Sequence, residues 1–139
     1  MDYGITGVTG FIGSHVAERL LKDGHRVHAY GRRLPQDAHK LDVWRNCTTR
    51  TLINLETSVP DFSQCDRVIH LAADMGGVGY FTKHDFMPYL KNSRMTFNVL
   101  EAVDRYRVER SFMAASACAY PTELQMIKGH APRLYEAEL

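Results

Sequence analysis

The sequence predicts an α/β fold, a doubly wound parallel sheet of five strands, and three observations predict it. Short apolar segments alternate with segments whose apolar residues recur every three or four positions. A glycine-rich turn joins the first apolar segment to the first helical one. The segment Arg67–Ala72 is apolar and β-branched enough to be buried on both faces, as parallel strands are. Strands that alternate with helices form right-handed βαβ units, and these units build a parallel sheet.

The first unit is the clearest. Tyr3–Thr6 is the first expected strand, and three glycines spaced three residues apart follow it, Gly7, Gly10 and Gly13. The next helix presents one apolar face, formed by Phe11, Ile12, Val16, Ala17, Leu20 and Leu21. Gly24 then lies where this helix should end, a position that often needs the left-handed conformation open to glycine.

The later elements follow the same alternation. Further strands are expected at Arg26–Tyr30, Thr51–Leu55, Arg67–Ala72 and Arg110–Ala115. One helix is expected around Ala38–Trp44. A glycine-rich loop with Gly76, Gly77 and Gly79 should precede a long helix, whose apolar face contains Met95, Val99, Ala102, Val103 and Tyr106.

Composition limits the function classes. The 139 residues suit one folded domain, 45% of them are hydrophobic, and 17 basic against 16 acidic side chains give a net charge of +1. Binding to nucleic acid or to a membrane surface is not expected. Both are negatively charged, and this chain has almost no excess of positive charge to attract them. No apolar run approaches the ~20 residues of a membrane span.

The spacing of the cysteine and histidine residues does not predict a metal site. Cys47, Cys65 and Cys118 are odd in number and widely spaced, which fits neither a disulfide framework nor zinc ligation and favours a reducing, cytoplasmic setting. His25 and His28 are expected to be surface histidines rather than a metal pair.

The glycine turn predicts a dinucleotide site. One glycine permits the tight turn, one lets the backbone approach a pyrophosphate, and one lets the helix pack closely on the sheet. Free amides at the start of the helix then face the phosphates. The usual spacing is G-x-G-x-x-G, so a tight turn without a ligand is the alternative, and the strand, turn and helix context favours the cofactor.

The motif Thr6-Gly7-x-x-Gly10-Phe11-Ile12-Gly13 resembles the TGxxGxxG fingerprint of the extended short-chain dehydrogenase/reductases, the NAD-dependent epimerase/dehydratase family. The resemblance continues through Leu71-Ala72-Ala73, Asn92, residues 98–102 and Ser116. It implies that residues 1–139 form a Rossmann domain that binds NAD, an incomplete domain with the substrate domain absent. The cofactor-binding residues that it implies are Gly7, Gly10, Phe11, Ile12, Gly13, Arg32, Asn54, Leu71, Ala72, Ala73 and Asn92.

Two segments, LAADMGGVGYF from Leu71 and ASACAYP from Ala115, are similar to those of nucleotide-sugar epimerases within this family. The resemblance implies a substrate of the GDP-mannose class, which is transiently oxidised at C4 and exchanges protons at C3 and C5. Cys118 would be one acid/base, and Ser116 would hydrogen-bond the C4 hydroxyl. Substrate would lie against Gly76, Gly77, Ser116, Ala117 and Cys118. A thiol suits this role, because its pKa of ~8.5 is readily lowered by nearby cations.

Two departures from the family pattern stand out. Gly31 replaces the acidic residue that normally binds the ribose hydroxyls at the end of the second strand. Arg32 and Arg33 follow it and could hold a 2′-phosphate, which would favour NADP, or could be a solvated pair. A second acidic position appears as Asn54, which can bond adenine but carries no charge.

The second departure concerns the catalytic pair. The family uses Tyr-x-x-x-Lys after the fifth strand, and no tyrosine of this sequence has a lysine four residues on. We therefore expect an inactive N-terminal part of an epimerase, with apolar surface at an open sheet edge that is exposed or pairs in a homodimer. The alternatives are a module that binds or senses NAD(P) without catalysis, and an NADP-linked reductase of the same superfamily.

Overall fold

A computed structural model describes residues 1–32, 36, 38–76, 78–84 and 86–115 of the chain. Five expected site residues therefore lie outside the described residues: Arg33, Gly77, Ser116, Ala117 and Cys118.

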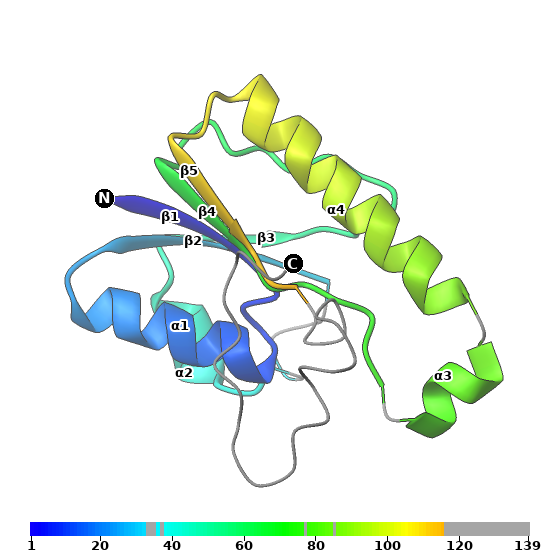
Figure 1. Cartoon of the computed structure of the whole chain (residues 1–139). Helices are drawn as coiled ribbons and strands as arrows, with labels where there is room; N and C mark the ends of the chain where they lie inside the picture. The colour runs from blue at the N-terminus through cyan, green and yellow to red at the C-terminus, as the bar shows by residue number, and fades with distance from the viewer. Residues whose placement is uncertain (33–35, 37, 77, 85, 116–139) are drawn as a thin grey trace, which may run out of the picture.

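The described part of the chain contains a five-stranded sheet in the order β3-β2-β1-β4-β5 (Figure 1). All neighbouring strands are parallel. The strands are β1 (Asp2–Thr6), β2 (Arg26–Gly31), β3 (Thr49–Leu52), β4 (Arg67–His70) and β5 (Arg110–Met113). The chain winds one way from β1 to β3 and the other way from β4 to β5, so the doubly wound parallel sheet predicted from the sequence is confirmed.

Helices cover both faces of this sheet, as Figure 1 shows. On one face lie α1 (Phe11–Lys22) and α2 (Leu41–Asn46), and on the other lies α4 (Met87–Arg105), preceded by the short α3 (Val78–His84). The opposite placement follows from the right-handed crossover rule, because the chain moves in opposite directions along the sheet in its two halves.

Two apolar clusters form the core, one on each face. Beneath α1 and α2 the buried residues include Ile5, Val27 and Trp44, and beneath α4 they include Phe62 and Val68. The α1 helix ends where expected, since Gly24 has a φ of +79° and its amide bonds the carbonyl of Leu21 at 3.1 Å.

Several boundaries differ from expectation, since β4 ends at His70 rather than Ala72 and β5 ends at Met113 rather than Ala115. The third strand ends at Leu52 rather than continuing to Leu55, because Asn54 begins a turn in which its side-chain oxygen accepts the Glu56 amide at 3.1 Å. The helix expected around Ala38–Trp44 is shifted to Leu41–Asn46. The glycine-rich segment after β4 contains helix α3, which the glycines concealed in the sequence.

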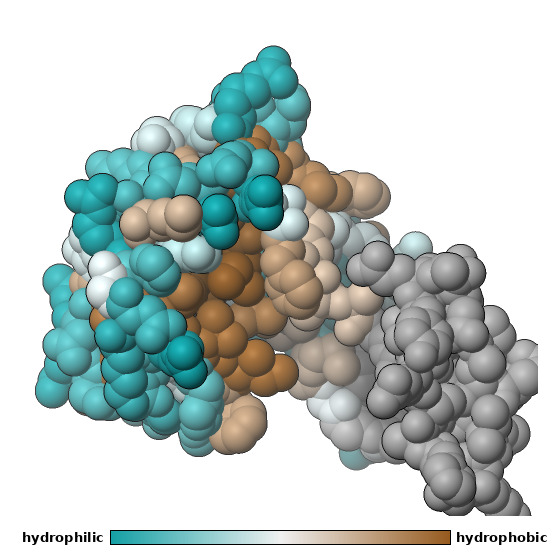
Figure 2. Space-filling view, turned by 60° about the vertical axis from the view of Figure 1, so that its left-hand side comes forward, coloured by the Kyte–Doolittle hydropathy of each residue, from teal (hydrophilic) through white to brown (hydrophobic). Residues whose placement is uncertain are grey.

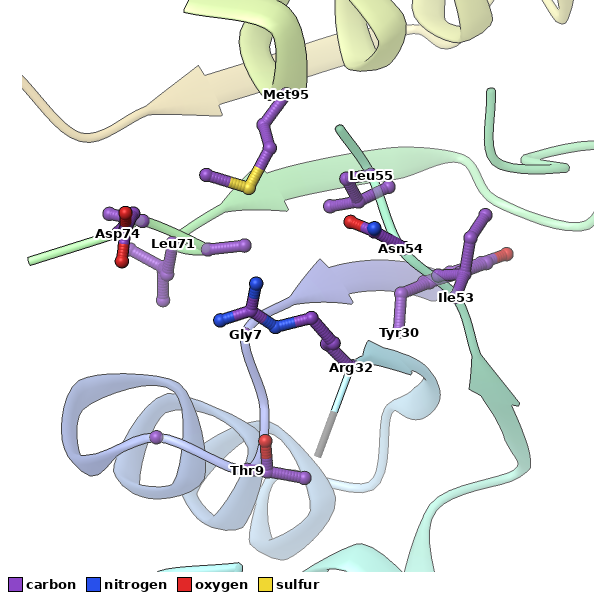
Figure 3. A pocket seen from close by; sticks show the side chains of 14 residues that line it. Gly7, Thr9, Tyr30, Arg32, Ile53, Asn54, Leu55, Leu71, Asp74 and Met95 are labelled. Carbon is purple, nitrogen blue, oxygen red and sulfur yellow. The ribbon is translucent and has the colours of Figure 1, made fainter. Parts of the chain in front are cut away.

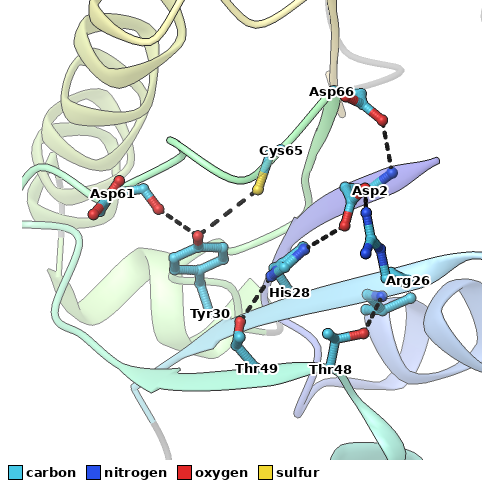
Figure 4. A network of polar contacts seen from close by, with 10 residues as sticks. Asp2, Arg26, His28, Tyr30, Thr48, Thr49, Asp61, Cys65 and Asp66 are labelled. Atoms are coloured by element: carbon cyan, nitrogen blue, oxygen red, sulfur yellow. Dashed lines mark hydrogen bonds and ion pairs between the residues drawn. The ribbon is translucent and has the colours of Figure 1, made fainter.

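The expectation that His28 is a surface residue is wrong. Its side chain is 4% exposed and lies at the edge of the sheet where the strands begin (Figure 4). Nε2 lies 2.9 Å from Asp2 Oδ1 and Nδ1 lies 2.9 Å from Thr49 Oγ1. Asp2 also pairs with Arg26. The polar network satisfies the imidazole, so a histidine is accepted in a strand whose residues are buried on both faces.

The β5 edge strand is largely exposed, as is the opposite edge strand β3. Arg110, Ser111 and Phe112 are exposed, and Phe112 retains 58% of its accessible surface. Figure 2 shows apolar surface gathered into one region that hydrophilic residues border. An exposed apolar edge was expected from the sequence, and the homodimer remains a prediction. In the described ranges, none of the helices is both long and apolar enough to span a bilayer.

Candidate functional site

The glycine turn brings α1 against the end of β1 so closely that side chains are excluded. Gly7 has a φ of +76°, and a Cβ atom there would lie 2.8 Å from the amide nitrogen of Ala72. A Cβ on Gly13 would lie 2.2 Å from the Gly7 carbonyl oxygen. The Gly10 amide closes the turn by bonding that same oxygen at 3.0 Å. Gly7 and Gly13 thus have the tasks in the tight turn and in helix packing that the motif predicts, and the approach to a pyrophosphate stays a prediction.

The start of α1 offers free backbone donors. The helix begins at Phe11 after the N-cap Gly10, and its first-turn amides have no acceptor within the helix. Within the described part of the chain no side chain caps this end, and its first turn has no acidic residue. The Phe11 and Ile12 side chains are 67% and 62% exposed, so any contribution of these two residues to phosphate binding comes from the backbone.

A pocket opens at the carboxyl ends of β1, β2 and β4, next to this turn (Figure 3). It is lined by Gly7, Thr9, Gly10, Tyr30, Gly31, Arg32, Ile53, Asn54, Leu55, Leu71, Ala72, Ala73, Asp74 and Met95. Ligands of open α/β sheets bind at this place, where the strand order reverses.

The pocket unites most of the predicted cofactor residues. Seven of them line it: Gly7, Gly10, Arg32, Asn54, Leu71, Ala72 and Ala73. Gly13 is buried in the packing of α1, and Asn92 lies behind the pocket wall. The sequence analysis did not identify Thr9, Tyr30, Ile53, Leu55, Asp74 and Met95 as lining residues. These follow from the topology rather than from a motif.

Thr6 fixes the wall between β1 and β4. Its side chain is fully buried, and its oxygen accepts the amides of Leu71 and Ala72 at 3.1 and 3.2 Å. Its hydroxyl proton is then left for His70 Nδ1, 2.7 Å away, which places the imidazole proton on Nε2. Burial lowers the pKa of His70, so the ring is neutral. His70 is thus a satisfied core histidine, and Thr6 orients the Leu71-Ala72 backbone.

Asp74 connects the pocket to α4. Asn92 accepts the Asp74 amide at 2.7 Å and donates to its carbonyl at 3.0 Å. The Asp74 carboxylate accepts a hydrogen bond from Tyr80 at 2.8 Å and pairs with Lys91 at 3.2 Å. Burial raises the pKa of Asp74, and these two contacts outweigh it, so the net pKa is lowered and the carboxylate stays charged. Asn92 therefore positions the loop instead of reaching into the pocket.

Arg32 carries a positive charge into the pocket. Its guanidinium Nη1 lies 3.1 Å from Glu56 Oε1, and Figure 3 shows the side chain reaching across the pocket from the end of β2. Glu56, which the sequence analysis overlooked, is only 15% exposed and does not line the pocket. Gly31, just before Arg32, has space beside it: a Cβ atom would meet Thr9 at an ordinary 3.4 Å.

The residues expected to act on substrate are only partly described. Gly76 is exposed, and a Cβ there would lie 2.5 Å from the Tyr80 side chain. Gly77, Ser116, Ala117 and Cys118 lie outside the described residues. The amide of Ala114, just after β5, bonds the carbonyl of His70, the last residue of β4, at 3.3 Å.

The two described cysteines are unsuited to acid/base work. Cys47 and Cys65 are buried and free, and burial raises the pKa of each thiol to about 11. Thiols with such pKa values are protonated and unreactive near neutral pH. Among the described residues there is also no group of three His, Cys, Asp or Glu side chains that could hold a metal ion.

Comparisons with known proteins agree with the geometry. The family model described as "NAD dependent epimerase/dehydratase family" matches residues 4–135. GDP-mannose 3,5-epimerase 1 of Oryza sativa subsp. indica is 35% identical over 133 residues, and GDP-mannose 3,5-epimerase of Arabidopsis thaliana is 35% identical over 125. Each alignment covers 88% of this chain and 32% of the relative, so the chain spans about a third of these relatives' length.

The solved structures show the same fold. A UDP-glucose-4-epimerase from Stenotrophomonas maltophila, with bound NAD and formylated UDP-arabinopyranose, superposes with a TM-score of 0.72 at 22% identity. The match covers 86% of this chain and 38% of that structure. At this identity the superposition establishes the fold of the described sheet and helices.

Proposed function

Because the chain belongs to the NAD-dependent epimerase/dehydratase family, we propose that it is the dinucleotide-binding part of a nucleotide-sugar epimerase. The observation that carries this proposal is the pocket where the strand order reverses, walled by Gly7, Gly10 and the Leu71–Asp74 segment. The residues present fit a dinucleotide for two reasons. The glycines of the turn have no Cβ atoms that would keep a ligand away from the backbone, and the first amides of α1 are free to bind phosphate.

Each residue in this proposal has a role in binding. The α1 amides bind the pyrophosphate, and Thr6 holds the Leu71-Ala72 backbone against it. Asn54 lies beside the adenine end of the pocket, where its amide group can bond the base. The bound dinucleotide would supply hydride transfer to and from C4 of a sugar.

The chemistry at the sugar is proposed from the resemblance. Ser116 hydrogen-bonds the C4 hydroxyl, and Cys118 removes or returns a proton beside the C4 ketone, where the α-protons are acidic. The substrate class that the relatives favour is a GDP-hexose, with Gly76 and Gly77 allowing it to approach the loop backbone. The location is cytoplasmic in this proposal, consistent with free thiols at Cys47 and Cys65.

Calorimetric titration with NAD and NADP tests the binding proposal. We expect saturable binding of at least one dinucleotide, lost in Ala73→Tyr, since Ala73 is exposed and lines the pocket, so a larger side chain fills the pocket without disturbing the core. The matched control is Ser58→Tyr, at an exposed position that does not line this pocket. Absence of binding by both dinucleotides would overturn the proposal.

Incubation with GDP-mannose and NAD tests the catalytic state. No tyrosine of this sequence has a lysine four residues on, so we expect no turnover by the chain alone. An epimerised product formed at an ordinary enzymatic rate would contradict this expectation. Dinucleotide binding without any GDP-mannose binding would instead favour the second candidate, a module that senses NAD(P), which the same missing pair supports.

A further inference from the structure

We propose that the pocket selects a dinucleotide with a 2′-phosphate, NADP rather than NAD, and that Arg32 is the residue that selects it. The inference rests on the proposed function, since it specifies which dinucleotide the same pocket takes. Three features support it: the end of β2, the environment of the Arg32 guanidinium, and the charges around that guanidinium.

The end of β2 lacks the group that recognises NAD. A carboxylate usually accepts hydrogen bonds from the ribose hydroxyls at this point, and Gly31 has no side chain. Packing does not impose the glycine, because a Cβ there would meet only Thr9 at 3.4 Å and Trp44 at 3.6 Å. Its φ is also outside the left-handed region that favours glycine. The position therefore lacks a carboxylate although a Cβ atom would fit there.

The next residue supplies the opposite charge. Arg32 has 57% of its side chain exposed and lines the pocket, and its guanidinium points inward from the strand end (Figure 3). It lies at the end of β2, where the adenosine ribose of a dinucleotide rests on this fold, and it lines the same pocket as Gly7. A guanidinium presents a planar fork of donors that matches the oxygens of a phosphate.

Glu56 orients Arg32 without satisfying it. The ion pair uses one nitrogen, Nη1, at 3.1 Å, out of five N–H donors. Glu56 is itself held, because its amide bonds Asn54 Oδ1 at 3.1 Å, and its carboxylate does not line the pocket. The pair restricts the arginine to the pocket wall, so less side-chain entropy is lost when an anion binds.

The neighbouring acidic group does not cancel this charge. Asp74 also faces the pocket, but its carboxylate already accepts Tyr80 at 2.8 Å and pairs with Lys91 at 3.2 Å. Around the pocket two cations, Arg32 and Lys91, balance two carboxylates, Glu56 and Asp74. A 2′-phosphate can therefore accept hydrogen bonds from the Arg32 guanidinium without repulsion from excess negative charge. The ribose 2′-hydroxyl of NAD, in contrast, finds no carboxylate at Gly31.

Comparison of two adenosine probes isolates this contact. We would measure the dissociation constants of adenosine 2′,5′-bisphosphate and 5′-AMP, and of NADP and NAD, by calorimetry at low and at physiological salt. We expect the 2′-phosphorylated member of each pair to bind at least tenfold tighter, and the ratio to fall as salt rises. Arg32→Gln should remove the ratio, because the loss of affinity should fall mainly on the 2′-phosphorylated member of each pair.

Two further variants make the test specific. Arg105→Gln changes the same residue type in an exposed ion pair, with Glu101 at 2.6 Å, about 15 Å along α4 from Met95 at ~1.5 Å per residue, and should leave the ratio unchanged. Gly31→Asp should reverse it, because the new carboxylate repels the phosphate and accepts the ribose hydroxyls.

The outcomes separate this inference from the proposed function. NAD binding as tight as NADP, or tighter, would overturn the selectivity of Arg32 and leave the proposed function standing. An equal loss of both dinucleotides in Arg32→Gln would also overturn it, since the residue would then only support the pocket wall. Binding of neither dinucleotide by the unmodified chain would overturn the proposed function as well.

Discussion

Replacement of Gly13 by alanine should destabilise the fold and open the dinucleotide site together. The added Cβ would lie 2.2 Å from the Gly7 oxygen and 2.7 Å from the Gly7 carbonyl carbon. The first distance is 1.2 Å inside the 3.4 Å at which ordinary contact begins (3.4 − 2.2 Å). The obstacle is backbone, which cannot rotate away, so α1 must move off the end of β1.

The expected cost follows from two opposing effects. Overpacking costs up to ~3 kcal/mol, and alanine in place of glycine within a helix returns about 0.5–1 kcal/mol. The net loss in free energy of unfolding is about 2 kcal/mol, or about 8 °C in melting temperature for a domain of this size. Dinucleotide affinity should fall more than tenfold, since the α1 amides leave their position beside Gly7.

Thermal and urea unfolding, with calorimetric titration, would measure both effects. Gly79→Ala is the matched control, because a Cβ there meets nothing within 4 Å and the residue lies inside α3. Gly24→Ala has open space but a φ of +79°, and should cost about 1 kcal/mol without changing affinity. If Gly13→Ala were as stable as Gly79→Ala, the close approach of α1 and β1 would be refuted.

Three further changes test other parts of the structure. Thr6→Val removes the hydroxyl that donates to His70 and accepts the amides of Leu71 and Ala72. The free energy of unfolding in urea should fall by about 1–3 kcal/mol, and dinucleotide binding should weaken. Unchanged stability would contradict the role of Thr6 as the β1–β4 link. The hydrogen bond from Arg26 lowers the pKa of Asp2, so its contribution is present above pH ~4 and is lost as pH falls through the folded pKa. Asp2→Asn should therefore be less stable than the unmodified chain at pH 6, and the difference should shrink in acid; a difference that grows below pH ~4 would show the opposite sign. Burial raises the pKa of Cys47 and Cys65 to about 11, so mass spectrometry after brief iodoacetamide treatment at neutral pH should find both unmodified until urea is added; prompt labelling of either would mean that it is not buried in solution.

The sequence was most informative where backbone geometry and side-chain type are linked directly. The glycine turn and the apolar segment at Arg67 predicted the first βαβ unit and the interior strand β4, because few other structures accept those residues. It was least informative about contacts between distant segments. Glu56 and Arg32 are 24 residues apart, and nothing local shows that Glu56 folds back toward β2.

His28 illustrates a different limit. Two polar partners, Asp2 and Thr49, come from the two neighbouring strands and make burial of the imidazole acceptable, and Arg26 pairs with Asp2 in turn. A strand read alone shows only a charged or polar residue at that position, which favours the surface. Helix α3 (Val78–His84) also differs from what its residues suggest one by one. It is helical with Gly79 inside it, although glycine lowers helix propensity.

The central position of β1 has a consequence for synthesis on the ribosome. Strand β1 is synthesised before both of its partners, since it pairs with β2, 24 residues later, and with β4, about 64 residues later, as the Thr6–His70 contact shows. Until β4 emerges, one edge of β1 has no partner, and such non-local pairing slows folding. The nascent chain therefore exposes an apolar strand edge for several seconds at ~5–20 residues per second, which makes this interval the one in which a chaperone would matter most.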